Sequence, residues 1–140
     1  MEKKDLKPAG VFKYFEEICQ VPRPSKKEEK IIAYLKAFGA KHNLETKVDE
    51  AGNVLIKKPA TPGKENLQTV VLQSHIDMVC EKNNDVQHDF LTDPIETEID
   101  GEWLKAKGTT LGADNGIGVA TELAILADDS IEHGPLECLF

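Results

Sequence analysis

Apolar side chains recur at helical spacing near the amino terminus. The positions separated by three or four residues are Val11, Phe12, Phe15, Ile18 and Cys19. This spacing predicts an amphipathic helix over about residues 7–19. Pro22 and Pro24 end the pattern, because each proline removes a backbone donor and restricts the residue before it.

A second helix is predicted directly after the prolines. Ser25-Lys-Lys-Glu28 has the spacing of a capping box, in which the hydroxyl and the carboxylate each accept an amide hydrogen bond at the start of a helix. We expect this helix to begin there and to end near residues 42–43. Its buried face is formed by Ile31, Ile32, Leu35 and Phe38.

Alternating residues and turn signals predict two β-hairpins. The first covers residues 44–57, with the turn Asp49-Glu-Ala-Gly52 between its strands. The second covers residues 95–106, where Asp100-Gly101 is the strongest short hairpin signal in the chain. A strand is also expected from Leu136 to Phe140.

The stretch Thr69–Asp77 is an apolar run that ends in two chemically active side chains. Its unbroken Val70-Val71-Leu72 core predicts a central strand buried on both faces. Alternation along the strand turns His75 and Asp77 to the same side. Open α/β sheets bind ligands at the carboxyl ends of their strands, so this pair is a candidate metal or acid/base site.

Asp114 lies in a glycine-rich turn, residues 108–116, that opens a third helix running to about Ala127. This helix is apolar almost all round and is expected to be buried. One interpretation is that Asp114 caps the helix. The flanking glycines instead indicate close packing around the carboxylate. Their spacing matches neither a dinucleotide-binding loop nor a P-loop, and the acidic positions of a calcium loop are absent.

A divalent metal accounts for His75 and Asp114 together. Neutral imidazole and carboxylate are ordinary zinc ligands, and a carboxylate can bridge two ions that hold a water between them. Asp77 would then orient His75 through its other ring nitrogen. Cys80 is a further candidate ligand, although a buried thiol is the favoured interpretation.

Composition narrows the class of protein. The chain has 140 residues, enough for one domain with a real core. Its 17 basic and 25 acidic residues give a net charge of −8, which argues against nucleic acid and anionic membranes as partners. The amino terminus lacks the apolar core of a secretory signal, and no window has the length of a membrane span, so a cytoplasmic location is expected.

Three cysteines occur without a CxxC pair, which argues against a disulfide framework or a thiolate zinc site. They are Cys19, Cys80 and Cys138. We expect reduced thiols, with Cys19 and Cys138 in the core.

Several segments resemble the aminoacyl-histidine dipeptidases, a branch of the co-catalytic zinc peptidases. The matching segments are Ile18–Ser25, Leu72–Val79, Asp100–Leu104 and Gly108–Gly118. The resemblance implies that His75 binds one metal ion, that Asp114 bridges two, and that Asp77 acts as the catalytic residue that steers His75. The ions would be Zn²⁺, or another divalent metal such as Co²⁺ or Mn²⁺. The resemblance also implies a cis peptide bond between Asp114 and Asn115.

The implied fold is a layered α/β/α domain built on a mixed β-sheet with helices on both faces. Family members carry a Glu-Glu pair, which supplies the general base and a metal ligand, shortly after the strand that begins here at Leu136. No such pair occurs up to Phe140. We therefore expect residues 1–140 to be the amino-terminal part of a metallopeptidase catalytic domain, inactive alone, in a parent that dimerises through a separate lid domain.

The implied reaction of the parent is hydrolysis of small peptides, specifically of dipeptides of the Xaa-His type, by a water activated between two zinc ions. Two alternatives stay open at this point. One is another di-zinc enzyme, namely an aminoacylase, a tripeptidase or a carboxypeptidase. The other is a non-catalytic binding module in which His75 and Asp114 have structural roles.

Overall fold

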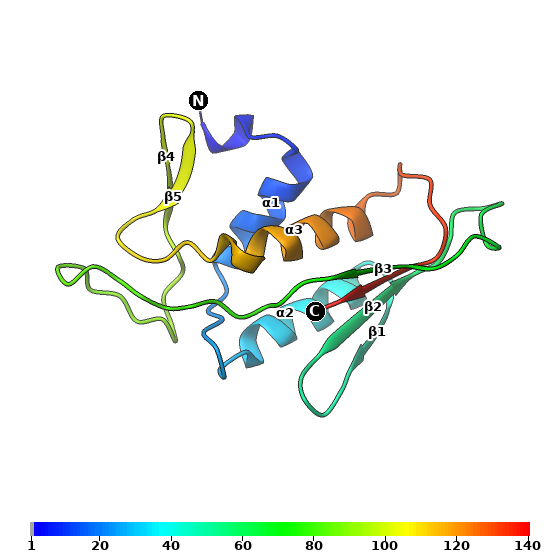
Figure 1. Ribbon diagram of the computed structural model, residues 1–140, viewed down its shortest axis with the longest axis horizontal. Helices are drawn as coiled ribbons and strands as arrows, with labels where there is room; N and C mark the ends of the chain where they lie inside the picture. Colours follow the sequence, from blue (N-terminus) through cyan, green and yellow to red (C-terminus); the bar gives the residue numbers. More distant parts are fainter. Residues whose placement is uncertain (1) are drawn as a thin grey trace.

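The computed structural model describes residues 2–140 and has an α/β architecture (Figure 1). Its three α-helices are α1 (Ala9–Cys19), α2 (Glu29–Lys41) and α3 (Ala113–Ala127). A short 3₁₀ helix, η1 (Lys3–Asp5), precedes them. Among the described residues, no helix combines the length and the apolar character needed to cross a membrane.

Six strands form two sheets within the described chain. Their bounds are β1 (Glu45–Val48), β2 (Val54–Lys58), β3 (Val70–Gln73), β4 (Thr97–Asp100), β5 (Trp103–Ala106) and β6 (Leu136–Leu139). Strands β4 and β5 form a separate hairpin, and the larger sheet has the order β1-β2-β6-β3. Strand β6 is antiparallel to β2 and parallel to β3. This mixed sheet with its helices confirms the α/β class, and both hairpins lie where the sequence predicts them.

The helices pack against one face of the larger sheet. Ile56 is fully buried on that face, and Lys58, two residues further along β2, donates a hydrogen bond of 3.2 Å to the Ile125 carbonyl of α3. Helix α2 lies over the same face, because a Cβ on Gly39 would meet Thr46, the strand partner of Ile56. The helix layer expected on the opposite face does not occur among residues 2–140.

One apolar cluster links the three helices to strands β2 and β6. Its largest fully buried members are Phe15, Ile18, Ile31, Leu35, Ile56, Leu123 and Leu126. Helices α1 and α3 lie side by side in it (Figure 1). Cys19 and Cys138 are buried there as predicted, and desolvation raises the pKa of each thiol to about 12.

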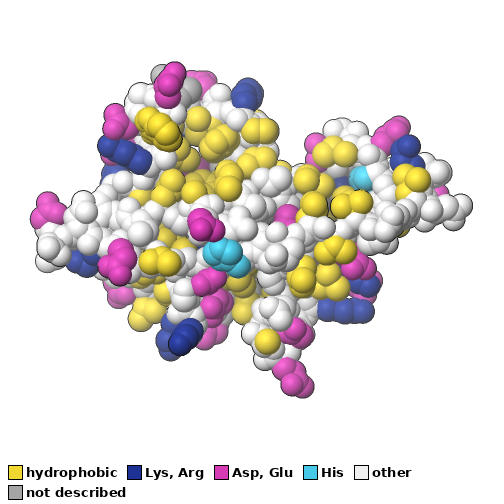
Figure 2. All heavy atoms as spheres, in the orientation of Figure 1, with side chains coloured by type: hydrophobic (Ala, Val, Ile, Leu, Met, Phe, Trp, Pro, Cys, Tyr) yellow, Lys and Arg dark blue, Asp and Glu magenta, His cyan; other side chains and the backbone are white. Residues whose placement is uncertain are grey.

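Strand β3 is the terminal strand of the larger sheet, so the prediction of a central strand is wrong for the described residues. Val70 and Val71 are 50% and 56% exposed, because β3 pairs only with β6. Figure 2 shows apolar side chains open to solvent on the face in view. An apolar run therefore does not by itself identify the partner strands or show that both faces are covered.

The start of the second helix also differs from the prediction. Helix α2 begins at Glu29 rather than next to Ser25. A turn comes first, in which Lys26 adopts a left-handed backbone with φ of 66° and donates its amide to Glu28 Oε1 at 2.7 Å. The Ser25 hydroxyl therefore does not cap the helix and is free for another partner.

A carboxyl group lies inside the core, beside the strand that leads to His75. Glu122 of α3 is 4% exposed, and Ser74 Oγ lies 2.5 Å from its Oε2. Glu122 Oε1 is buried without a hydrogen-bond partner among the described residues. Burial raises the pKa of Glu122 to about 7, although the Ser74 hydrogen bond acts in the opposite direction.

This carboxyl predicts a pH-dependent stability. The folded protein binds the Glu122 proton more tightly than the unfolded chain, so the free energy of unfolding falls as pH rises from 4.5 towards about 7. We expect Glu122→Gln to remove up to about 3 kcal/mol of that fall, as measured by urea denaturation at about pH 5 and about pH 8. Glu65→Gln, in an exposed loop, is the control. Parallel profiles for the wild type and Glu122→Gln would contradict the prediction.

Candidate metal site

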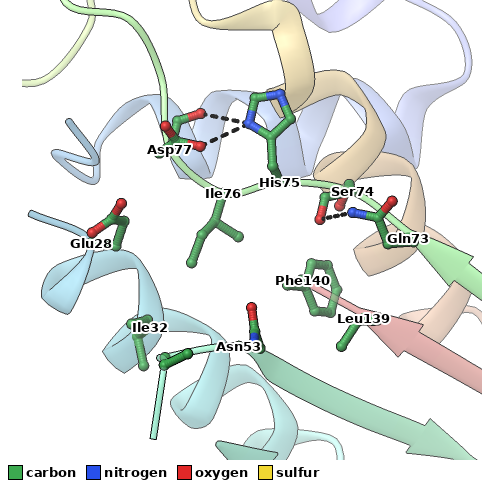
Figure 3. A pocket seen from close by; sticks show the side chains of 12 residues that line it. Glu28, Ile32, Asn53, Gln73, Ser74, His75, Ile76, Asp77, Leu139 and Phe140 are labelled. Atoms are coloured by element: carbon green, nitrogen blue, oxygen red, sulfur yellow. Dashed lines mark hydrogen bonds and ion pairs between the residues drawn. The ribbon is translucent and has the colours of Figure 1, made fainter. Parts of the chain in front are cut away.

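The segment after β3 presents His75 and Asp77 on the same side, as the sequence predicts. The strand ends at Gln73, and the chain continues without regular structure through Asp77. Figure 3 shows the His75 ring beside the Asp77 carboxylate, whereas Ile76 points the opposite way, towards a cavity. Ile76 is 8% exposed and anchors this segment to the core.

The His75 ring is held by a carboxylate at each nitrogen. Its Nδ1 lies 2.9 Å from Asp77 Oδ1, and its Nε2 lies 3.0 Å from Asp114 Oδ1. The structure thus brings together the three side chains that the sequence singles out, although Asp114 is 37 residues beyond Asp77. The ring is about half exposed, and the Asp114 side chain is 97% exposed.

The irregular start of α3 leaves Asp114 without a capping role. Gly112 precedes the helix in a left-handed conformation with φ of 72°, and Asp114 itself has non-helical angles. The neighbouring Asn115 accepts the amide hydrogen bond instead, from Gly118 at 3.2 Å. The peptide bond between Asp114 and Asn115 is cis, as the family resemblance implies. Asp114 is consequently free to point towards His75 and solvent.

The cluster is strongly acidic around one imidazole. The hydrogen bond to Asp114 is the main cause that raises the pKa of His75 above its ordinary value; burial opposes it, and the hydrogen bond to Asp77 adds a smaller increase. The Ser25 hydroxyl is the main cause that lowers the pKa of Asp77, and His75 adds to it. Figure 2 shows a histidine on the face in view with acidic side chains next to it. Such a site favours a cation.

Two residues that hold this cluster were not identified from the sequence. Ser25 Oγ lies 2.5 Å from Asp77 Oδ2, and the buried Arg23 donates to the carbonyl of Ile76 at 3.3 Å. Both lie in the proline-flanked segment between α1 and α2. Hydrophobic periodicity carries no signal there, and the capping-box spacing assigned the Ser25 hydroxyl to a different partner.

A cavity of about 330 Å³ lies beside the cluster. Its apolar lining includes Ile32, Ile76 and Phe140, whereas Asp77 and Glu28 contribute carboxylates (Figure 3). The cavity has a mixed polar and apolar lining and lies on the side of the segment towards which Ile76 points, opposite to the His75 ring.

The donor set of His75 and Asp114 fits a divalent metal. Tetrahedral zinc bonds of about 2.0–2.2 Å put two donor atoms about 3.3–3.6 Å apart. His75 Nε2 and Asp114 Oδ1 lie at a hydrogen-bond distance of 3.0 Å, so a small outward movement would let both bind one ion. The exposed Asp114 carboxylate is open to a second ion. No group of three or more His, Cys, Asp or Glu side chains arranged to hold a metal was found in residues 2–140. These residues therefore offer an incomplete ligand set.

Cys80 does not join the cluster. Its thiol is half-buried and lies 3.6 Å from the Met78 carbonyl, towards which it donates. Burial raises the pKa of Cys80, which disfavours the thiolate that a metal requires. The thiol is thus half-buried rather than buried as expected, and its role outside the ligand set stays a prediction.

Comparison with known proteins gives a close match over nearly the whole chain. The cytosol non-specific dipeptidase of Escherichia coli (strain K12) is 52% identical over 138 residues, which are 99% of this chain and 28% of that protein. No protein-family model matches the chain. The chain thus spans a little more than a quarter of the length of this relative.

Solved structures agree on the fold. The aminoacylhistidine dipeptidase of Vibrio alginolyticus superimposes with a TM-score of 0.95 at 54% identity, covering 99% of this chain and 28% of that one. A Staphylococcus aureus tripeptidase and the Bacillus cereus aminopeptidase PepT give TM-scores of 0.72 and 0.75 at 22% and 23% identity, each over 93% of this chain and 35% of theirs, and support the fold alone. Along almost all of its length, the chain is therefore similar in sequence and structure to a segment of the aminoacylhistidine dipeptidases.

Proposed function

We propose that the chain is part of a metal-dependent peptidase that hydrolyses dipeptides, including those of the Xaa-His type. The observation that carries the proposal is the His75 imidazole held between Asp77 and Asp114, in a chain 52% identical to a dipeptidase.

The three side chains have distinct roles in this proposal. His75 Nε2 and the Asp114 carboxylate would hold divalent ions, Zn²⁺ or another such as Co²⁺ or Mn²⁺, and Asp114 would be the ligand common to two of them. Asp77 keeps a proton on His75 Nδ1, so that Nε2 presents its lone pair outwards. Ser25 fixes the second oxygen of Asp77, which prevents that carboxylate from turning away. Ions bound there would polarise the scissile carbonyl and acidify a water molecule.

The rest of the reaction centre belongs to other parts of the enzyme in this proposal. Residues 1–140 form the amino-terminal part of a catalytic domain, and the general base and remaining ligands come from further chain. A separate lid domain joins two such subunits into a homodimer. The net charge of −8 favours a small peptide over nucleic acid or an anionic membrane as a partner. The Escherichia coli relative is named a cytosol dipeptidase, which supports a cytoplasmic location.

Removing either ligand should abolish metal binding at this site. We expect His75→Ala and Asp114→Ala each to lower Zn²⁺ affinity by roughly 100-fold or more, because each removes one of two protein donors. Isothermal titration with Zn²⁺ measures the effect. His133→Ala removes a histidine whose Nδ1 instead contacts the Gly134 carbonyl, and serves as the control. Equal affinities in all four proteins would contradict the assignment.

Replacing the orienting carboxylate should have a smaller effect. In Asp77→Asn the side chain keeps its shape but can no longer favour the proton on His75 Nδ1, and we expect about a 10- to 100-fold loss of Zn²⁺ affinity. The same titration, together with the ¹⁵N shifts of the His75 ring at fixed pH, measures the loss and the change of tautomer. Wild-type affinity with an unchanged tautomer would remove Asp77 from the site.

The full-length enzyme and the 140-residue polypeptide should differ in activity. We expect the full-length enzyme to hydrolyse Xaa-His dipeptides only with divalent metal bound, and the 140-residue polypeptide to hydrolyse none. A substrate panel containing dipeptides, tripeptides and N-acyl amino acids, with and without a chelator, tests both expectations. Preferred cleavage of tripeptides or N-acyl amino acids would replace the substrate class. Turnover by the polypeptide alone would contradict the division of the site.

A further inference from the structure

Arg23 is a buried cation next to the metal site but outside its ligand set. It is 2% exposed and lies between Pro22 and Pro24, in the segment that joins α1 to α2. Its guanidinium donates from Nη1 to the Ile76 carbonyl at 3.3 Å and from Nη2 to the Gly112 carbonyl at 2.9 Å. One side chain therefore bridges two segments that are far apart in the sequence.

The two carbonyls belong to the two segments that carry the proposed metal ligands. Ile76 lies between His75 and Asp77, and Gly112 lies two residues before Asp114. A rigid, planar guanidinium donates in a fixed fork, so it fixes the separation of two acceptors better than a flexible ammonium does. The separation of the segments limits how closely His75 and Asp114 approach.

The backbone of the same segment supports one side of the bridge. The Met78 amide donates to the Arg23 carbonyl at 3.0 Å, and Pro24 forms a parallel bridge with Met78. Arg23 is thus attached to the segment after β3 through both its main chain and its side chain. Only its Nη2 group reaches across to the turn before α3.

Two glycines make room for the guanidinium. A Cβ added to Gly112 or to Gly116 would lie 2.7 Å from Arg23 Nη2, which is closer than such atoms approach in folded proteins. These glycines flank Asp114 in the sequence. Arg23 is thus one reason for glycine at both positions; Gly112 also has a left-handed backbone and lies against Met78.

Burial of Arg23 is unfavourable for stability alone. Desolvation lowers the pKa of Arg23, and its Nε has no hydrogen-bond partner among the described residues. No carboxylate within 4.0 Å pairs with Arg23 in the described chain. An apolar side chain of similar volume would avoid these costs. Arginine at this position is therefore explained by the geometry of its two hydrogen bonds to carbonyls rather than by a gain in folding stability.

We propose that Arg23 is a positioning residue that sets the separation of His75 and Asp114, and through it the affinity for metal. This inference rests on the proposed function, because the ligands it positions are those assigned there. It assigns Arg23 no contact with metal or substrate.

Arg23→Met tests the proposal, with Lys58→Met as the matched control. Lys58 is also a nearly buried cation, 9% exposed, and its Nζ donates to the carbonyls of Ile125 and Asp128 at 3.2 and 2.8 Å. It lies at the opposite end of α3 from Asp114. Both variants remove a charge and two carbonyl hydrogen bonds, but only Arg23→Met touches the site.

Co²⁺ alone is the probe, and its visible absorption reports binding and ligand geometry. We expect Arg23→Met to weaken Co²⁺ binding by about 10-fold or more and to change the spectrum, whereas Lys58→Met stays within about 2-fold of the wild type. Arg23→Lys should restore little of the affinity, because an ammonium lacks the fork. Urea denaturation shows that each variant is folded during the titration. Where Arg23→Met does not fold, Arg23→Lys carries the same comparison.

Amide hydrogen exchange of the metal-free protein provides a readout independent of metal. The Met78 amide lies on one bridged segment, and the Gly116 amide, which donates to the Gly112 carbonyl, lies on the other. We expect both amides to exchange faster in Arg23→Met than in Lys58→Met at matched global stability. Equal exchange would overturn the proposal.

The outcomes separate this inference from the proposed function. Wild-type Co²⁺ binding that depends on His75 and is unchanged in Arg23→Met overturns the role of Arg23 and leaves the proposed function intact. Full-length wild-type protein that binds no Co²⁺ overturns the proposed function. In that case hydrogen exchange alone decides whether Arg23 fixes the two segments.

Discussion

The pairing of β6 with both β2 and β3 is the constraint on which the fold depends. Through its antiparallel edge β6 joins the hairpin of β1 and β2, and through its parallel edge it joins the strand that leads to His75. These contacts connect residues more than 60 positions apart, so they are formed at a high cost in chain entropy. The helices contribute the apolar surface that offsets this cost, because α1, α2 and α3 share one core with β2 and β6.

The site is assembled from segments without regular secondary structure that the core holds in place. His75 follows the end of a strand, Asp114 occupies an irregular turn, and Ser25 lies in a loop between helices. Each is within two residues of a group that is buried or locally constrained, such as Ile76 or Gly112. Reactive side chains therefore stay exposed while their backbone is fixed, which is the usual arrangement of loops that carry function.

Local patterns predicted the local structure, and chemistry predicted the composition of the site. The turn Asp100-Gly101 specified its hairpin, and alternation placed His75 beside Asp77. The predicted central position of β3 was wrong, because the strands next to β3 are determined by pairings with distant residues, which an apolar run does not encode. The prediction that the Ser25 hydroxyl caps α2 was also wrong. The same oxygen atom can serve either as a helix cap or as a contact of Asp77, and local spacing does not tell which. The hydrogen bonds of the buried Arg23 could not be predicted, because no repeating pattern of apolar residues includes it.

The open position of Asp114 has a consequence for kinetics. Its side chain is 97% exposed, so no described side chain has to move before an ion reaches it. Association with these residues would then be governed by exchange of the ion's own water ligands, and the acidic surroundings would favour the encounter at low ionic strength. Loading of such a site follows the free ion concentration of the medium within the time of mixing.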